Sequence, residues 1–272
     1  MAKDTTGLDD HQRDFVRLVE ATATHRRRFE VFADFCEMSA LAISNSVDIL
    51  QKEKREERYL QIVKKYDPDQ VANFPRMLGC IVLSLERGMS DCLGAIFMNM
   101  ELGNTHAGQF FTPFPVSHLM ASLVMGDARA EIERKGFLRV YEPAAGAGGM
   151  VVATAQVLLD QGINYQHCMH AFAQDIDALA CQMAYLTLSL CHVPAIVVHG
   201  NTISLEEWGH WVTPAHVLGR WDRRLKRTQA EQACVPLLVD IEPRPTSPPA
   251  SEAEEAAAAV VNKRLEQLSL FG

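Results

Sequence analysis

Apolar residues recur every three or four positions from residue 1 to about residue 101, a spacing that predicts helices. Phe15, Leu18 and Val19 share one helical face, and the apolar segments 74–88 and 91–103 each end at a glycine, as helices often do. No strand pattern interrupts this part of the chain. We therefore expect a helical N-terminal domain over residues 1–104.

The pattern changes after residue 105, where short apolar runs alternate with helical ones. The expected strands are "FLRVYE" (137–142), "CMHAFAQD" (168–175) and "PAIVVHGN" (194–201). The expected helices between them are "MVVATAQVLLDQG" (150–162) and "DALACQMAYLTLSLC" (177–191). Strands that alternate with helices predict an α/β domain with a parallel sheet and right-handed crossovers, which we assign to residues 105–227.

The pattern weakens beyond Asn201. "VPLLVDI" (235–241) is a candidate further strand, and "EPRPTSPPASEAEE" (242–255) has the proline content of a linker. We expect residues 228–272 to form a proline-rich linker and a terminal helix.

The composition of the chain argues against several classes of protein. The net charge of −8 means that nucleic-acid binding would need a local basic patch. The seven cysteines show no C-x-x-C pair, so we expect neither a disulfide framework nor a metal site. No signal peptide and no apolar run of 18 residues is present, which favours a cytoplasmic protein without a membrane span.

The stretch "YEPAAGAGGM" (141–150) places small residues between an expected strand and an expected helix. Gly146, Gly148 and Gly149 would let the backbone approach a ligand at a helix N-terminus. The dinucleotide fingerprint G-x-G-x-x-G would need a glycine or alanine where Val151 stands. Glu142 precedes the turn, and its carboxylate suits an ammonium group such as that of S-adenosylmethionine.

Polar residues also end the next two expected strands. Asp175 and Asp177 follow the second strand, where a carboxylate commonly binds ribose hydroxyls, and both are also candidate helix caps. Asn201 ends the third strand, where it could bind an adenine edge or serve only as a turn residue.

These motifs, together with "GQFFTP" (108–113), resemble those of the adenine-N6 DNA methyltransferases, above all the modification subunits of type I restriction systems. The resemblance covers roughly residues 100–205 and implies a Rossmann-like class I methyltransferase sheet, which we expect to be truncated after the third or fourth strand. It implies S-adenosylmethionine as cofactor, with Asp175 on the ribose. The cofactor residues that it implies are Phe110, Thr112, Pro113, Glu142, Ala144, Gly146, Gly148, Asp175, Asp177 and Asn201. Asn201 departs from the aspartate usual in that family.

The catalytic [N/D/S]-P-P-[Y/F/W] motif of that family is absent. "SPPA" (247–250) lacks the aromatic residue that would stack on a flipped base, so we interpret it as linker. The catalytic residues are therefore unassigned. If the chain methylates by itself, the acceptor groups are to be sought among Asn201, Thr213, Pro214 and His216.

A basic cluster follows, in "RWDRRLKR" (220–227). Its arginines could clamp phosphates while its tryptophan stacks on a base, so we expect any nucleic-acid contact here, with a surface helix or partner interface as the alternative. The candidate residues are Arg220, Trp221, Arg223, Arg224 and Arg227.

Three functions stay open at this point. The chain is an S-adenosylmethionine-binding member of the DNA adenine-N6 methyltransferase family that modifies DNA only with a partner, or an inactive regulatory or anti-restriction module that binds DNA or a partner. The third is a methyltransferase for a non-DNA substrate, with an acceptor pocket formed by the segment Trp208–Trp221. DNA, other restriction-modification subunits and a second copy of the chain are the candidate partners.

Overall fold

The computed structural model describes residues 7–102 and 111–233, and it groups the chain into two compact units, Met1–Arg224 and Leu225–Gly272. The account below concerns the first unit. None of the helices in the described part of the chain is long and apolar enough to cross a membrane.

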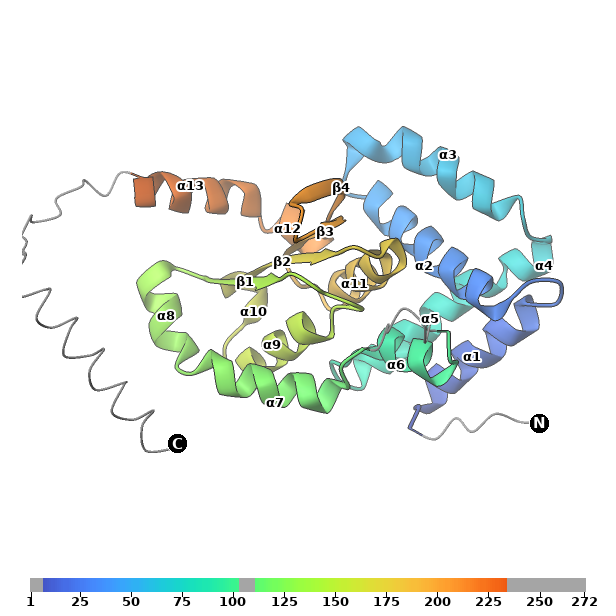
Figure 1. Cartoon of the computed structure of the whole chain (residues 1–272), viewed down its shortest axis with the longest axis horizontal. Coiled ribbons are helices and arrows are strands. Elements are labelled where there is room, and N and C mark those ends of the chain that lie inside the picture. The colour runs from blue at the N-terminus through green and yellow to red at the C-terminus, as the bar shows by residue number, and fades with distance from the viewer. Residues whose placement is uncertain (1–6, 103–110, 234–272) are drawn as a thin grey trace, which may run out of the picture. The chain divides into compact units, whose positions relative to one another are not determined.

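The described residues 7–102 form helices joined by short loops and no strand, as the apolar spacing predicts (Figure 1). The helices are α1 (Asp10–Thr22), α2 (Arg28–Asn45), the 3-10 helix η1 (Ile49–Gln51), α3 (Lys52–Val63), α4 (Pro68–Val71), α5 (Asn73–Glu86) and α6 (Cys92–Asn99). Phe15 lies at the centre of their core, with its ring edge-on to Phe32 and Phe35. All three side chains are fully buried, so packing of the apolar faces holds this region together.

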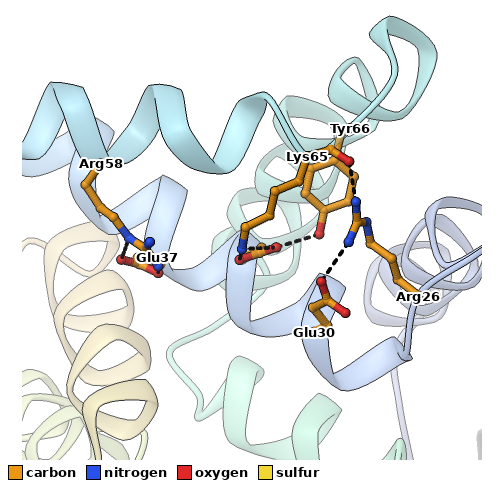
Figure 2. A network of polar contacts seen from close by, with 7 residues as sticks. Arg26, Glu30, Glu37, Arg58, Lys65 and Tyr66 are labelled. Atoms are coloured by element: carbon orange, nitrogen blue, oxygen red, sulfur yellow. Dashed lines mark hydrogen bonds and ion pairs between the residues drawn. The ribbon is translucent and has the colours of Figure 1, made fainter.

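Polar contacts join α2 to α3 and to the turn after it (Figure 2). Glu37 of α2 accepts two hydrogen bonds from the Arg58 guanidinium, at 2.6 and 2.8 Å. Asp34 is buried and accepts from the Lys65 ammonium and from the Tyr66 hydroxyl, at 2.9 and 2.7 Å. Burial and the Asp34 carboxylate raise the pKa of Tyr66, so the phenol stays a hydrogen-bond donor.

Residues 111–233 contain a four-stranded sheet. Its strands are β1 (Leu138–Glu142), β2 (Met169–Asp175), β3 (Ala195–Asn201) and β4 (Glu206–Val212), in that spatial order. The first three strands are parallel, as expected, and β4 returns antiparallel to β3. The sequence did not indicate β4, because none of its residues 206–212 is buried and only Trp208, Trp211 and Val212 are apolar. The remaining helices are α7 (Phe114–Met125), α8 (Ala128–Lys135), α9 (Gly149–Asp160), α10 (Tyr165–Cys168), α11 (Ala178–Leu190), α12 (Pro214–Leu218) and α13 (Trp221–Ala233).

Helices α9 and α11 cover one face of the sheet. Ala171 and Ala173 of β2 point to this face and pack in one buried cluster with Val152 of α9 and Ala184 of α11. Small residues on the strand let the two helices approach closely, and α7 packs on the outer side of α9. The fold class is thus confirmed as a helical N-terminal region followed by a short, mostly parallel Rossmann-like sheet.

The domain boundaries expected from the sequence stay predictions. The junction at 104/105 and the segments 235–241 and 242–255 lie outside the described residues. The helical region and the sheet belong to one compact unit, and α13 continues to Ala233, past the boundary expected at residue 227.

Candidate functional site

The turn between β1 and α9 contains two glycines with positive φ, and they serve different purposes. Gly146 has φ +54°, and its N–H donates to Oδ2 of Asp175 at 2.8 Å. Gly148 has φ +88°, and a side chain there would meet the α11 backbone at Ala184, 3.3 Å away. Gly146 therefore ties the turn to the end of β2, whereas Gly148 allows α9 to pack closely on α11.

A cavity of about 220 Å³ opens at this turn, at the carboxyl ends of β1 and β2. Phe111 closes one side, and its ring lies where a side chain at Gly146 would have to go, 2.8 Å from the Cβ position. The lining residues are Asp91, Phe111, Thr112, Ser117, Ala144, Ala145, Gly146, Ala147, Gly149, Met150, Asp175 and Ala180. The cavity thus joins the "GQFFTP" segment to the glycine turn, which are distant in sequence.

Asp175 is the carboxylate that the sequence predicts at the end of β2, and it reaches the cavity. Its Oδ2 accepts from the Gly146 N–H and its Oδ1 accepts from the Asp177 N–H, at 2.8 and 2.9 Å. These two bonds fix the orientation of the carboxylate. Each oxygen keeps a lone pair, so Asp175 can still accept from a ligand hydroxyl.

Asp91 is a second cavity carboxylate, which the sequence analysis missed. It precedes α6 and accepts from the Gly94 N–H at 2.9 Å, so the sequence marks it only as a helix cap. Only 6% of it is exposed, and burial raises its pKa to about 6 despite the Gly94 hydrogen bond. One of its oxygens lies 3.2 Å from the Cβ position at Gly149, the first residue of α9.

Glu142 ends β1 beside the cavity but is not among its lining residues. Its Oε1 accepts from the Ala144 N–H at 3.3 Å. Burial, and secondarily the charge of Asp175, raise the pKa of Glu142. A cation bound near Glu142 would relieve this repulsion.

The structure brings Thr112, Ala144, Gly146 and Asp175 to the cavity and places other predicted cofactor residues elsewhere. Pro113 is the cap residue of α7, and Phe110 lies outside the described residues.

Asp177 and Asn201 use their side chains locally. Asp177 caps α11 by accepting from the Ala180 N–H at 2.8 Å. Asn201 accepts from the N–H groups of Ile203 and Ser204 in the turn before β4. The two alternatives weighed from the sequence, a helix cap and a turn residue, describe these contacts, and a cofactor role for either residue stays a prediction.

The expected base-stacking role of Trp221 needs correction. The indole is fully buried, edge-on to Phe137 at a centroid distance of 5.0 Å, and Arg224 covers its ring at 3.7 Å. It therefore has no face available to a nucleotide. Arg220 and Arg223 are exposed, whereas Arg224 is partly buried, so burial lowers its pKa. Nucleic-acid contact by the arginines, Arg227 included, stays a prediction.

The three tryptophans of the segment Trp208–Trp221, which was a candidate acceptor pocket, do not lie together, and an acceptor pocket in this segment stays a prediction. Trp208 is half-exposed in β4 and lines a cleft of about 690 Å³ against α2 and α3. Trp211 packs under the Arg55 guanidinium at 4.5 Å in the same cleft. Trp221 instead packs against Phe137 and His170, at the start of β1 and β2.

The loop suggested as a source of acceptor groups lies at the wrong end of the sheet. Because β4 is antiparallel, Thr213 returns to the start of β3, where its hydroxyl donates to Val193 O and accepts from Ala195 N. His216 is buried beside His170 at the start of β2, 2.8 Å between ring nitrogens. Thr213, Pro214 and His216 therefore cannot close over the cavity, which opens at the carboxyl ends of β1 and β2.

Comparison with known proteins agrees with this geometry. The model of the N-6 DNA Methylase family matches residues 94–218, which include the glycine turn, the whole sheet and every lining residue of the cavity except Asp91. This part of the chain is therefore similar to the N-6 DNA methylase family. A search of curated proteins gave no significant match.

Two solved structures resemble the chain. One is a Listeria monocytogenes protein assigned to the class I S-adenosylmethionine-dependent methyltransferases, with 16% identity and a TM-score of 0.39 over 71% of this chain and 54% of that one. The other is the methyltransferase subunit of a type I restriction-modification system from Streptococcus thermophilus, with 20% identity and a TM-score of 0.38 over 72% and 40%. The chain thus spans about half the length of these proteins or less.

Proposed function

We propose that the chain binds S-adenosylmethionine in the cavity at the glycine turn and transfers its methyl group to DNA adenine only together with a partner chain. The observation that carries this proposal is the convergence of Asp91, Asp175 and the N-terminus of α9 on one cavity, of which Asp175 and α9 lie within the family-matched residues. The arrangement offers separate contacts for the ammonium group, the carboxylate and the ribose hydroxyls of that cofactor.

The charges suit a zwitterionic ligand. Asp91 and Glu142 offer carboxylates to an ammonium group, and the free N–H groups of the first turn of α9 suit a carboxylate. Asp175 is held by Gly146 and Asp177 in an orientation that presents it to ribose hydroxyls. When bound, S-adenosylmethionine supplies an electrophilic methyl group.

Partner dependence rests on what the chain lacks. Transfer to an adenine amino group needs the base to be extruded, stacked on an aromatic ring and aimed by hydrogen-bond acceptors. Residues 1–272 contain no [N/D/S]-P-P-[Y/F/W] tetrapeptide, and the segment 213–216 lies at the opposite end of the sheet. We infer that another chain supplies these groups.

Calorimetric titration of the purified chain with S-adenosylmethionine and with its demethylated product tests the cofactor site. We expect binding at micromolar to millimolar ligand, and its loss in Gly146→Val, whose side chain would strike Phe111 from a backbone with positive φ. Gly162→Val is the matched control, because Gly162 also has positive φ but has open space around it. Absence of binding at millimolar ligand contradicts the proposal.

Methyl transfer from labelled cofactor to unmethylated DNA tests the second half. We expect the isolated chain to be slower by orders of magnitude than about one turnover per minute, because the geometry that it lacks is worth several kcal/mol. A rate near one per minute would show that the chain carries its own acceptor groups. Cofactor binding with no transfer in the presence of every restriction-modification subunit of the host would favour the inactive regulatory module.

A further inference from the structure

The hydroxyl of Ser117 is a buried polar group that the fold itself leaves unsatisfied. Ser117 lies on the buried side of α7 and is 1% exposed, and its Oγ has no hydrogen-bond partner in the described part of the chain. A serine or threonine inside a helix can donate to the carbonyl four residues earlier. Ser122 of the same helix and Thr154 of α9 do so, at 2.8 and 2.9 Å. Ser117 does not, although burial of an unpaired hydroxyl costs free energy.

The position of Ser117 sets it apart from the other unpaired groups. It is one of the lining residues of the cavity at the glycine turn, where α7 runs beside α9 (Figure 1). Among the described residues, five others bury a side-chain polar atom without a partner, and they are Asn45, Tyr185, Thr187, Ser189 and Trp221. None of these five lines that cavity. A bound ligand is therefore within reach of the Ser117 hydroxyl and of no other group of this kind.

Helix α9 begins at the same cavity with N–H groups that no side chain caps. Helices α8 and α11 each start at an aspartate that accepts a hydrogen bond from the first turn. Helix α9 starts instead at Gly148, which has no side chain to do this. Gly149 and Met150 of its first turn line the cavity. The first turn of α9 and the Ser117 hydroxyl thus place unused hydrogen-bond donors at the wall of one cavity.

Asp91 adds an acceptor beside these donors. Its Oδ1 accepts from the Gly94 N–H, and no hydrogen bond to its Oδ2 is formed within the described residues. Oδ2 lies 3.2 Å from the Cβ position at Gly149, the first residue of α9. The ammonium and carboxylate groups of an α-amino acid are attached to one carbon atom, so they need an acceptor and donors that lie side by side. The wall formed by Asp91, Ser117 and the start of α9 meets this requirement.

We propose that Ser117 makes the cavity selective for ligands that carry a free α-carboxylate. Its hydroxyl donates to the carboxylate of S-adenosylmethionine, together with the first-turn N–H groups of α9, while Asp91 binds the ammonium group. This inference rests on the proposed function and adds to it the choice between related ligands.

The selectivity follows from what a ligand without the carboxylate leaves behind. In that case the Ser117 hydroxyl and the N–H groups of α9 stay buried and unpaired. A site built to hydrogen-bond one group of a ligand rejects an analogue that lacks this group more strongly than an apolar site would. We therefore expect decarboxylated S-adenosylmethionine, which keeps the ammonium and sulfonium groups, to bind more weakly than S-adenosylmethionine.

Calorimetric titration of the full chain and of Ser117→Ala with both ligands, to millimolar concentration, tests the inference. We expect Ser117→Ala to weaken S-adenosylmethionine about tenfold or more, the loss of one hydrogen bond to a charged group. Its affinity for the decarboxylated analogue should change by less than about twofold. An equal loss for the two ligands, or a wild-type chain that binds them equally well, overturns the proposed selectivity.

Thr187→Val is the matched control. Thr187 is also 1% exposed and also has an unpaired hydroxyl, but it lies on α11 away from the lining of the cavity. Without ligand, both variants should keep or raise the melting temperature, because each removes a buried hydroxyl that has no partner. Only Ser117→Ala should lose affinity. A lower melting temperature of ligand-free Ser117→Ala would show that its hydroxyl is needed by the fold, and an equal loss of affinity in Thr187→Val would show an indirect effect. Either result contradicts the inference.

The same titrations separate this inference from the proposed function. A wild-type chain that binds neither ligand overturns the cofactor site, and the role of Ser117 with it. A wild-type chain that binds S-adenosylmethionine, with a Ser117→Ala variant that binds it equally well, overturns the role of Ser117 alone.

Discussion

The two ends of the parallel strands β1, β2 and β3 differ in how accessible their polar side chains are. At the carboxyl end, the turn after β1 holds an open cavity with Asp91 and Asp175 on its wall. At the amino end, Trp221 is buried in contact with Phe137 and His170. Both ends are rich in residues that can do chemistry, but only the carboxyl end leaves them accessible.

The difference follows from the direction in which the chain runs after each strand. Strands β1 and β2 each run into a helix, so their carboxyl ends meet at open turns where the backbone N–H groups are available. Strand β4 instead carries the chain back antiparallel, and α12 and the start of α13 then close the amino end. A residue such as His216 is thereby removed from the reaction side of the sheet, although it follows the third strand in sequence.

The largest effect that we expect is on stability, at the amino end. Trp221→Ala should lower the free energy of unfolding by about 3–5 kcal/mol, because it leaves a cavity between Phe137 and His170. Trp208→Ala, the half-exposed counterpart in β4, should cost less. Chemical denaturation measures both, and S-adenosylmethionine affinity of the folded variants should not change. A loss of S-adenosylmethionine affinity in folded Trp221→Ala would show that the amino end affects the cofactor cavity, and the contrast between the two ends would then be wrong.

The stability of the two ends should depend on pH in opposite directions. Burial, and then His216 and Arg139, lower the pKa of His170 to about 3, so the folded chain binds fewer protons there than the unfolded chain between about pH 3 and 6.5. Stability contributed by neutral His170 is therefore present above pH 6.5 and is lost as the pH falls. Asp91, with its pKa raised to about 6, binds more protons when folded, so its contribution is lost as the pH rises from about 4 to 6.

We therefore expect His170→Gln to reduce acid sensitivity and Asp91→Asn to increase it, each by at most about 1.4 kcal/mol per pH unit within these windows. Denaturation midpoints between pH 4 and 7 measure the slopes. Equal slopes in both variants and the wild type would show that neither group titrates differently on folding.

Asp91 should also set the pH dependence of cofactor affinity. An ammonium group binds the ionised carboxylate, so affinity for S-adenosylmethionine should rise with pH up to about 6 and then level off, by at most about tenfold per pH unit. Asp91→Asn should bind more weakly and lose this dependence. Calorimetry at pH 5, 6 and 7 measures it, and a wild-type affinity that is flat over this range would remove Asp91 from the ammonium site.

Most of the fold could be predicted from the sequence, because its signals are local. The helices of residues 1–101 are visible in the spacing of their apolar residues. Strands β2 and β3 are visible as short apolar runs, because they are buried. Strand β4 could not be predicted, since its neighbours decide its pairing and five of its seven residues are polar, glycine or half-exposed tryptophan.

The cavity was partly predictable. Gly146 and Asp175 stand in motifs that point to a ligand, and both reach the cavity. Asp91 could not be found, because only its tertiary contact with Gly149 at the start of α9 turns an ordinary helix cap into a cavity carboxylate. Gly148 shows the converse, since a motif glycine can be required for helix packing rather than for ligand approach.

The smallest effect that we expect separates the two aspartates at the end of β2. Asp177→Ala should lower stability by about 1 kcal/mol, the usual loss for a helix cap, and leave S-adenosylmethionine affinity unchanged. Asp127→Ala is the matched control, because Asp127 caps α8 through the same bond to the N–H three residues on, at 3.1 Å. Asp175→Ala, in contrast, should weaken the cofactor about 5- to 150-fold, the loss of one hydrogen bond to a charged group. The opposite outcome is that Asp177→Ala weakens cofactor binding more than about threefold while Asp127→Ala does not. That result would show that Asp177 contacts the ribose, as the sequence suggests, in addition to capping α11.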